Sequence, residues 1–281
     1  MKERIGTTLF DLRYAYESGQ PLAFHADYNN RTRTLSYFST GKPVRISFSG
    51  TPVHGAVTFT GSRKEVERRL RLSDDMKQVY KRINTDRHVN GSIIRYRGLR
   101  LTLNDPWETT VCFIISQFNN VKRIRLIVRN LIDKYGEEIR DSDGRVIGRA
   151  FPTSERMIGA TTKELFSLGT GFRAKYLQHA AEYCTNNLDL YNLPAHKYAK
   201  LKESLLEIHG VGDKVADCIA LMGYGNLNAF PIDVHIKRSM ERLYFKGEKQ
   251  KMKDIHEAAS EFWGEYRGYA NQYLFHDARM R

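Results

Sequence analysis

The sequence predicts an α+β fold, with a small N-terminal antiparallel β-sheet domain over residues 1–103 and a larger all-helical domain over residues 104–281. Two patterns carry this prediction. Within residues 34–60, apolar side chains alternate with polar ones, whereas after residue 104 they recur at intervals of three and four. The chain has 281 residues, 41% of them hydrophobic, which is enough for one large domain or two ordinary ones.

Three segments have the alternation of half-buried strands: Leu35–Phe38, Val44–Phe48 and Ala56–Phe59. Glycine and proline at 41–43 and at 50–52 indicate turns between them, so we expect neighbouring strands to pair antiparallel. A charged helical segment follows at Arg63–Leu72, and we interpret its charges as a solvated face.

The helical part is predicted to begin at Asp105 and Pro106, because an aspartate N-cap followed by proline is a typical helix start. An apolar stripe predicts a helix over 121–132. A second stripe, with apolar residues at intervals of four and three, predicts another over 236–243.

The cysteine content excludes a metal-cluster protein. Cys112, Cys184 and Cys218 are far apart and form no CxxC pair, so we expect a reducing compartment, no protein-bound metal and no cofactor. The chain opens without an apolar leader, and no apolar run approaches the roughly 20 residues that cross a bilayer. We therefore expect a soluble intracellular monomer that does not contact membranes.

The charge is strongly basic and uneven. The formal net charge is +13, and the first 100 residues, with 19 Lys and Arg against 9 Asp and Glu, supply +10 of it. Such a surface suits a polyanionic partner such as nucleic acid, but it also suits a role in solubility alone.

The segment 201–222 predicts two short helices, Leu201–Ile208 and Lys214–Met222, joined by a glycine-rich turn. Gly210 and Gly212 permit positive φ and leave space, so that backbone N–H groups can approach a phosphate oxygen. The alternative is an ordinary helical hairpin with glycines at a helix C-cap.

Two ionisable side chains near this turn are candidates for chemistry. Lys214 begins the second helix, where the positive end of the helix dipole disfavours a cation and favours a nucleophilic amine. Asp233 occupies the expected N-cap before the 236–243 helix. Most lysines have no catalytic role, and an N-cap aspartate is often only structural.

Residues 205–222 followed by 230–235 resemble the helix-hairpin-helix and Gly/Pro-Asp signature of the base-excision DNA glycosylases. Within that superfamily, Lys-Val-Ala-Asp-Cys at 214–218 resembles the 8-oxoguanine DNA glycosylase/AP lyases. The likeness covers most of 104–281, and Ser-Gly-Gln at 18–20 adds a weaker match. It implies an enzyme of base excision repair whose partner is duplex DNA containing a damaged base.

The resemblance implies a role for each candidate. Lys214 would attack the anomeric carbon of the damaged nucleotide, expel the base and remain linked as a Schiff base, after which β-elimination would nick the strand. Asp233 would stabilise the oxocarbenium-like transition state. The target base must leave the stack to be reached.

The resemblance also implies a base pocket. Cys218 and Phe275 match a cysteine and a phenylalanine that sandwich the flipped base, and Gly19 matches a glycine whose carbonyl accepts the N7–H of 8-oxoguanine. Asn271 matches a glutamine that reads the base edge, and adjacent Gln272 can make up the missing methylene. Taken alone, Cys218 and Phe275 also suit ordinary core positions.

Three more positions match DNA contacts. Phe172 matches an aromatic wedge that is a tyrosine in the family, and stacking needs no hydroxyl. Arg123 and Arg173 match two arginines that contact the cytosine left unpaired.

An asparagine run is only partly kept. Asn119 and Asn120 remain, but Phe118 replaces the first asparagine, which fills the vacated space in the family. This departure predicts weak discrimination of the opposite base. His235 matches a phosphate contact, although a lone helical histidine is more often a surface or core residue.

Other classes fit less well. Endonuclease III-like members carry a C-terminal four-cysteine cluster, whereas the last cysteine here is Cys218, and alkylation glycosylases lack the hairpin lysine. A glycosylase for another oxidised base and a non-catalytic helix-hairpin-helix DNA-binding protein remain as alternatives. We expect a cytoplasmic, nucleoid-associated location, or a nuclear one in a eukaryote.

Overall fold

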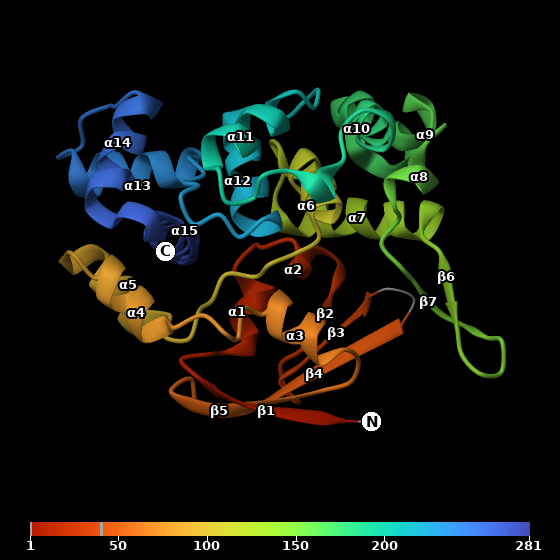
Figure 1. Ribbon diagram of the computed structural model, residues 1–281, viewed down its shortest axis with the longest axis horizontal. Coiled ribbons are helices and arrows are strands. Elements are labelled where there is room, and N and C mark those ends of the chain that lie inside the picture. The colour runs from red at the N-terminus through yellow and green to blue at the C-terminus, as the bar shows by residue number, and fades with distance from the viewer. Residues whose placement is uncertain (1, 40–41) are drawn as a thin grey trace.

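The computed structural model describes residues 2–39 and 42–281 and places a sheet below a broad layer of helices (Figure 1). The first 103 residues contain most of the strands and several short helices. In chain order these are β1 Glu3–Thr8, α1 Leu12–Glu17, α2 Leu22–His25, β2 Asp27–Asn29, β3 Thr34–Ser39, β4 Lys42–Gly50, β5 His54–Phe59, α3 Arg63–Arg69, α4 Met76–Ile83 and α5 Arg87–Arg95.

The sheet has the strand order β1-β5-β4-β3-β2, and every neighbouring pair is antiparallel. The three predicted strands and the following helix are confirmed as β3, β4, β5 and α3. Residue 41, in the first predicted turn, lies outside the described residues. The sequence did not predict β1 and β2, which complete the two edges.

Strand alternation places one face of the sheet in a small core. Leu35, Ile46 and Val57 are fully buried there, together with Leu12 of α1 and Val66 of α3. Burial of each such side chain contributes about 1.5–3 kcal/mol, so the sheet is fixed by the helices that cover it.

The rest of the chain is almost entirely helical. Its elements are α6 Pro106–Ser116, α7 Val121–Tyr135, β6 Glu138–Arg140, β7 Val146–Arg149, α8 Ser154–Met157, α9 Thr162–Leu165, η1 Phe166–Thr170, η2 Gly171–Arg173, α10 Ala174–Asn186, η3 Leu190–Asn192, α11 Tyr198–Leu206, α12 Asp213–Gly223, α13 Val234–Tyr244, α14 Met252–Trp263, η4 Gly264–Tyr266 and α15 Arg267–Met280. The prediction of an all-helical part therefore needs one correction, because β6 and β7 form an antiparallel hairpin between α7 and α8.

Two predicted helix starts are confirmed by their caps. The Asp105 carboxylate accepts the backbone N–H groups of Trp107 and Glu108 at 2.9 and 3.1 Å. The Asp233 carboxylate accepts the N–H of Ile236 at 2.8 Å. Each cap satisfies N–H groups that the helix leaves without an internal partner, typically worth about 1 kcal/mol.

The larger core draws on both parts of the chain. Val79 and Ile83 of α4 and Val89 of α5 belong to the same buried cluster as Tyr269 and Tyr273 of α15. Helices α4 and α5, which precede residue 103, thus pack with the C-terminal helix α15. The predicted division into domains 1–103 and 104–281 remains a prediction.

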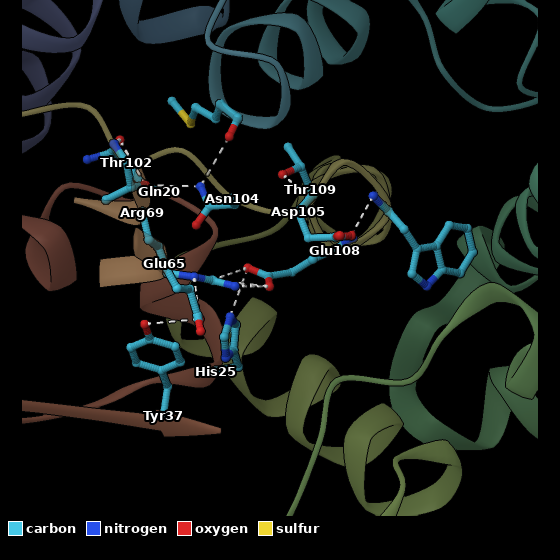
Figure 2. Close-up of polar contacts among 12 residues, drawn as sticks. Gln20, His25, Tyr37, Glu65, Arg69, Thr102, Asn104, Asp105, Glu108 and Thr109 are labelled. Carbon is cyan, nitrogen blue, oxygen red and sulfur yellow. Dashed lines mark hydrogen bonds and ion pairs between the residues drawn. The ribbon is translucent and has the colours of Figure 1, made fainter. Parts of the chain in front are cut away.

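A buried ion network joins the sheet side to the helical side (Figure 2). Glu108 of α6 accepts hydrogen bonds from Arg69 of α3 at 3.1 and 3.2 Å, and His25 of α2 lies 2.9 Å from the same carboxylate. All three side chains are at most 5% exposed. The network fixes the orientation of α6, which leads into the turn beside the hairpin.

Candidate active site and nucleic-acid interface

Lys214 lies in the first turn of α12, next to the glycine hairpin. Its Nζ is 5.1 Å from the centre of the Phe113 ring of α6, and Lys214 influences the Cys218 thiol one turn later in the same helix. Burial raises the pKa of Cys218 to about 11, although the Lys214 charge acts in the opposite direction. The thiol is therefore protonated at neutral pH and is not a competing nucleophile.

Asp233, at the N-cap of α13, also acts on this cysteine through its charge. The negative charge of Asp233 raises the pKa of Cys218, whereas the positive charge of Lys214 lowers it. Both groups therefore act on the same thiol. The structure thus brings together Lys214, Cys218 and Asp233 from α12 and the α13 cap. Lys214 also lines an open cavity of about 550 Å³ whose walls include Ile232 and Lys253.

Gly19 and Phe275 meet although 256 positions separate them in the sequence. Gly19 has a φ of +74° in the turn between α1 and α2, and a Cβ built there would lie 3.4 Å from the Phe275 ring and 2.5 Å from Arg279 Nη1. His235 of α13 lies edge-on to the Phe275 ring at 6.4 Å. The positive φ favours glycine at 19, and a Cβ there would also force the Arg279 guanidinium to move.

Asn271 and Gln272 are both buried in α15 and have different partners. Asn271 donates to the Pro231 carbonyl at 2.9 Å, which anchors the segment before Asp233. Gln272 donates to the Ser18 carbonyl at 3.1 Å, beside Gly19, and its Oε1 has no hydrogen-bond partner among the described residues. The free acceptor therefore belongs to Gln272, and base-edge reading by Asn271 remains a prediction.

The two hairpin glycines differ in conformation. Gly210 has a φ of +90°, and a Cβ there would lie 2.3 Å from the Tyr176 ring. Gly212, the N-cap of α12, has a φ of −95°, so of the two glycines only Gly210 adopts the positive φ that both permit. Gly212 is exposed, and apart from its chain neighbours none of the described residues has an atom within 4 Å of its missing Cβ. A side chain at 212 would therefore obstruct only a bound molecule such as DNA, and not the fold of the chain.

The turn between α6 and α7 projects an aromatic side chain. Phe118 is 93% exposed and has a φ of +50°, an uncommon conformation for a non-glycine residue. The asparagines beside it hold the turn: Asn119 donates to the Ile115 carbonyl at 2.9 Å, and Asn120 caps α7 by accepting the Arg123 N–H at 3.0 Å.

Phe172 projects beside Phe118, with ring centres 6.2 Å apart, and is 47% exposed. Arg173 and Arg123, near Phe172, hydrogen-bond to backbone carbonyls of the two loops that carry Phe118 and Phe172. Arg173, 5% exposed, donates to the carbonyls of Gln117 at 2.7 Å and Thr170 at 3.1 Å. Exposed Arg123 donates to the Gly169 carbonyl at 3.2 Å. The predicted cytosine contact of buried Arg173 therefore requires a change of hydrogen-bond partners, whereas Arg123 uses only one N–H group in this bond.

Gln117 connects these loops, and sequence reasoning did not single it out. Its side-chain amide donates to the Gly210 carbonyl at 3.0 Å, and its own carbonyl accepts from Arg173. The sequence offered one indication of its importance, since Gln117 directly precedes Phe118 and the asparagines that resemble the family's asparagine run. Arg279, also missed, had the signal of standing one helical turn after Phe275.

Within 2–39 and 42–281, no group of three or more His, Cys, Asp or Glu side chains is placed to hold a metal ion. Over the same residues, each helix is too short or too polar for a bilayer crossing.

The chain is similar in sequence to two N-glycosylase/DNA lyases. The N-glycosylase/DNA lyase of Saccharomyces cerevisiae is 32% identical over 213 residues, covering 64% of this chain and 56% of its own length. The chain thus spans just over half of that relative. A probable N-glycosylase/DNA lyase of Methanothermobacter thermautotrophicus is 28% identical over 237 residues, 77% of this chain and 75% of its own.

A solved structure is similar along the whole chain. It is the 8-oxoguanine glycosylase/lyase of Clostridium acetobutylicum, bound to double-stranded DNA with cytosine opposite 8-oxoguanine. It has 27% identity and a TM-score of 0.88, and the match covers 100% of this chain and 98% of the other. A family description, the HhH-GPD superfamily of base excision DNA repair proteins, matches residues 111–265. Since that match covers more than half of the sequence and includes the hairpin, Lys214 and Asp233, the chain belongs to the HhH-GPD superfamily of base excision DNA repair proteins.

Proposed function

We propose that this protein is a bifunctional DNA glycosylase and AP lyase that excises 8-oxoguanine from duplex DNA. The observation that carries the proposal is the cluster of Lys214, Cys218 and Asp233 at the start of α12 and α13. Gripping phosphates through backbone N–H groups needs neither the amine nor the carboxylate. A non-catalytic DNA-binding protein would have no use for this pair.

The reaction follows from the two side chains. The neutral amine of Lys214 attacks C1′ of the damaged nucleotide, the C1′–N9 bond breaks, and its electron pair leaves with the base. The Asp233 carboxylate stabilises the positive charge that develops on the sugar. Loss of a proton from nitrogen and opening of the sugar ring give the Schiff base, and loss of the 2′ proton expels the 3′ phosphate by β-elimination.

Access to C1′ requires the base to leave the helix, which costs a few kcal/mol. Phe172 and Phe118 fill the gap, since together they form the exposed aromatic tip of adjacent loops. Gly210 and Gly212 with the N-terminus of α12 hold a phosphate, and His235 another. The flipped base enters between Cys218 and Phe275.

We place the protein, as a monomer, in the cytoplasm at the nucleoid, or in the nucleus of a eukaryotic cell.

The test is a panel of duplexes that carry 8-oxoguanine, an oxidised pyrimidine or an abasic site. We expect single-turnover base loss and strand nicking with 8-oxoguanine and nicking at the abasic site. Nicking only at the oxidised pyrimidine and the abasic site would move the assignment to the other lesion class. Tight binding without base loss or nicking on any duplex would leave the phosphate-binding alternative.

A further inference from the structure

Arg279 lies in the proposed base pocket but has no partner there. It stands one helical turn after Phe275 on α15, with its guanidinium carbon 5.3 Å from the centre of that ring. On the other side, a Cβ at Gly19 would lie 2.5 Å from Arg279 Nη1. The guanidinium therefore lies against both Gly19 and Phe275, which the proposed function places around the flipped base.

The Nη1 nitrogen is buried and has no hydrogen-bond partner among the residues that the structure describes. Nearby arginines are better satisfied: Arg95 and Arg281 pair with Asp277 at 2.8 and 2.9 Å. Burial lowers the pKa of Arg279, and the charge of Arg125 acts in the same direction, whereas Asp233 opposes them. A buried N–H donor without an acceptor is costly, and at Nη1 this points to a ligand that supplies the acceptor.

We infer that Arg279 donates a hydrogen bond to the C8 carbonyl oxygen of the flipped 8-oxoguanine. This inference rests on the proposed function. A guanidinium is only a donor and needs an acceptor. The oxidised base presents a donor at N7 beside an acceptor at C8, and the pocket presents the Arg279 N–H groups against Gly19, whose carbonyl is the N7–H acceptor that the resemblance implies. Guanine presents an N7 lone pair and a C8–H, so it matches neither group.

The same contact assists the reaction. When the C1′–N9 bond breaks, its electron pair leaves with the base, and the negative charge spreads from N9 onto O8. A fixed positive donor at O8 binds this leaving group more strongly than it binds the intact nucleotide. Interactions that strengthen in the transition state raise the rate of the chemical step.

The test compares the unaltered protein with Arg279→Met, which keeps an unbranched side chain on Phe275 and removes the donors. A hydrogen bond to a charged group predicts that single-turnover excision of 8-oxoguanine falls by about 10- to 100-fold. β-Elimination at a preformed abasic site has no base in the pocket and should stay within about twofold, which also shows that the variant is folded. Arg279→Lys keeps the charge and should lose less than Arg279→Met.

Two controls sharpen the test. Arg281→Met removes an exposed guanidinium from the end of the same helix and should leave excision unchanged. In 8-thioguanine, N7–H is kept but sulfur replaces O8 and accepts hydrogen bonds weakly, so Arg279→Met should slow its excision less than that of 8-oxoguanine.

Several outcomes would overturn the inference. Equal or faster excision of 8-oxoguanine by Arg279→Met would do so, as would an equal loss on the abasic site or an equal loss on 8-thioguanine. In these cases the proposed function stands. If the unaltered protein fails to excise 8-oxoguanine, the proposed function itself fails, and the inference fails with it.

Discussion

The side-chain amide of Gln117 donates a hydrogen bond of 3.0 Å to the carbonyl of Gly210 and so fixes the glycine hairpin to the turn that carries Phe118. The backbone carbonyl of Gln117 also accepts from Arg173, beside Phe172. One residue thus sets the spacing between the expected phosphate grip and the expected wedge.

Replacing Gln117 with alanine should loosen that spacing. Loss of one neutral hydrogen bond costs about 0.5–1.5 kcal/mol, which predicts roughly 2- to 10-fold weaker binding to a duplex with a stable abasic analogue. Fluorescence anisotropy measures this. Gln78→Ala, on α4, serves as the control and should bind like the unaltered protein. Unchanged affinity of Gln117→Ala would show that the hydrogen bond does not support the interface.

The hairpin glycines should separate folding from binding. Gly210→Ala places a methyl group against the Tyr176 ring at positive φ, so it should destabilise the fold by about 1–2 kcal/mol or more. Gly212→Ala meets no atom of the chain and should keep its stability, yet weaken DNA binding severalfold. Thermal unfolding and anisotropy on both variants test this pair. If Gly212→Ala leaves the DNA affinity unchanged, a phosphate does not bind against Gly212.

Phe118 should make the enzyme tolerant of the base opposite the lesion. Its ring stacks and offers no hydrogen bond to cytosine, so excision of 8-oxoguanine should be similar opposite C, A, G and T. Phe118→Asn should raise the preference for cytosine, whereas Phe166→Asn, at another exposed phenylalanine, should not. A strong cytosine preference of the unaltered protein would contradict this interpretation.

The Glu108 network predicts a specific acid sensitivity. Burial acts to raise the pKa of Glu108, but Arg69 and His25 outweigh it, and the pKa falls from an ordinary 4.5 to about 2. A carboxyl whose pKa is lower in the folded state stabilises the fold above the unfolded pKa. That contribution is lost as the pH falls from about 4.5 to 2.

Glu108→Gln should therefore cost about 3 kcal/mol or more at pH 7, since it leaves Arg69 buried and uncompensated. The difference from the unaltered protein should shrink between pH 4.5 and 2, as measured by denaturant unfolding. Glu67→Gln breaks only the exposed pair with Arg63 and should change stability by less than about 1 kcal/mol. A constant difference across this pH range would argue against the charged network.

Local signals predicted most of the fold. Asp105 with Pro106, the cap at Asp233 and the alternation in β3 to β5 depend on residues close in sequence, and all are confirmed. β1 could not be found in this way, because Glu3–Thr8 is a strand through its pairing with β5, about 50 residues later. The short β6–β7 hairpin has too few residues to show a period.

The candidate site likewise contains residues that a local motif predicts and residues that only the folded structure brings together. Lys214, Cys218 and Asp233 lie in one continuous motif, so the sequence alone singled them out. The sequence could not tell which of the two hairpin glycines adopts positive φ, because glycine permits this conformation without requiring it. Arg279 was missed, since its significance depends on contact with Gly19 at the other end of the chain.

The central claim is that Lys214 forms a covalent bond with the deoxyribose of the damaged nucleotide. Borohydride reduction during the reaction with an 8-oxoguanine duplex, followed by peptide mapping, measures that bond directly. The account predicts a DNA adduct on Lys214, no trapping with Lys214→Gln, and normal trapping with Lys253→Gln, an exposed lysine of the same cavity. Trapping that persists in Lys214→Gln, or an adduct mapped to another lysine, would contradict it.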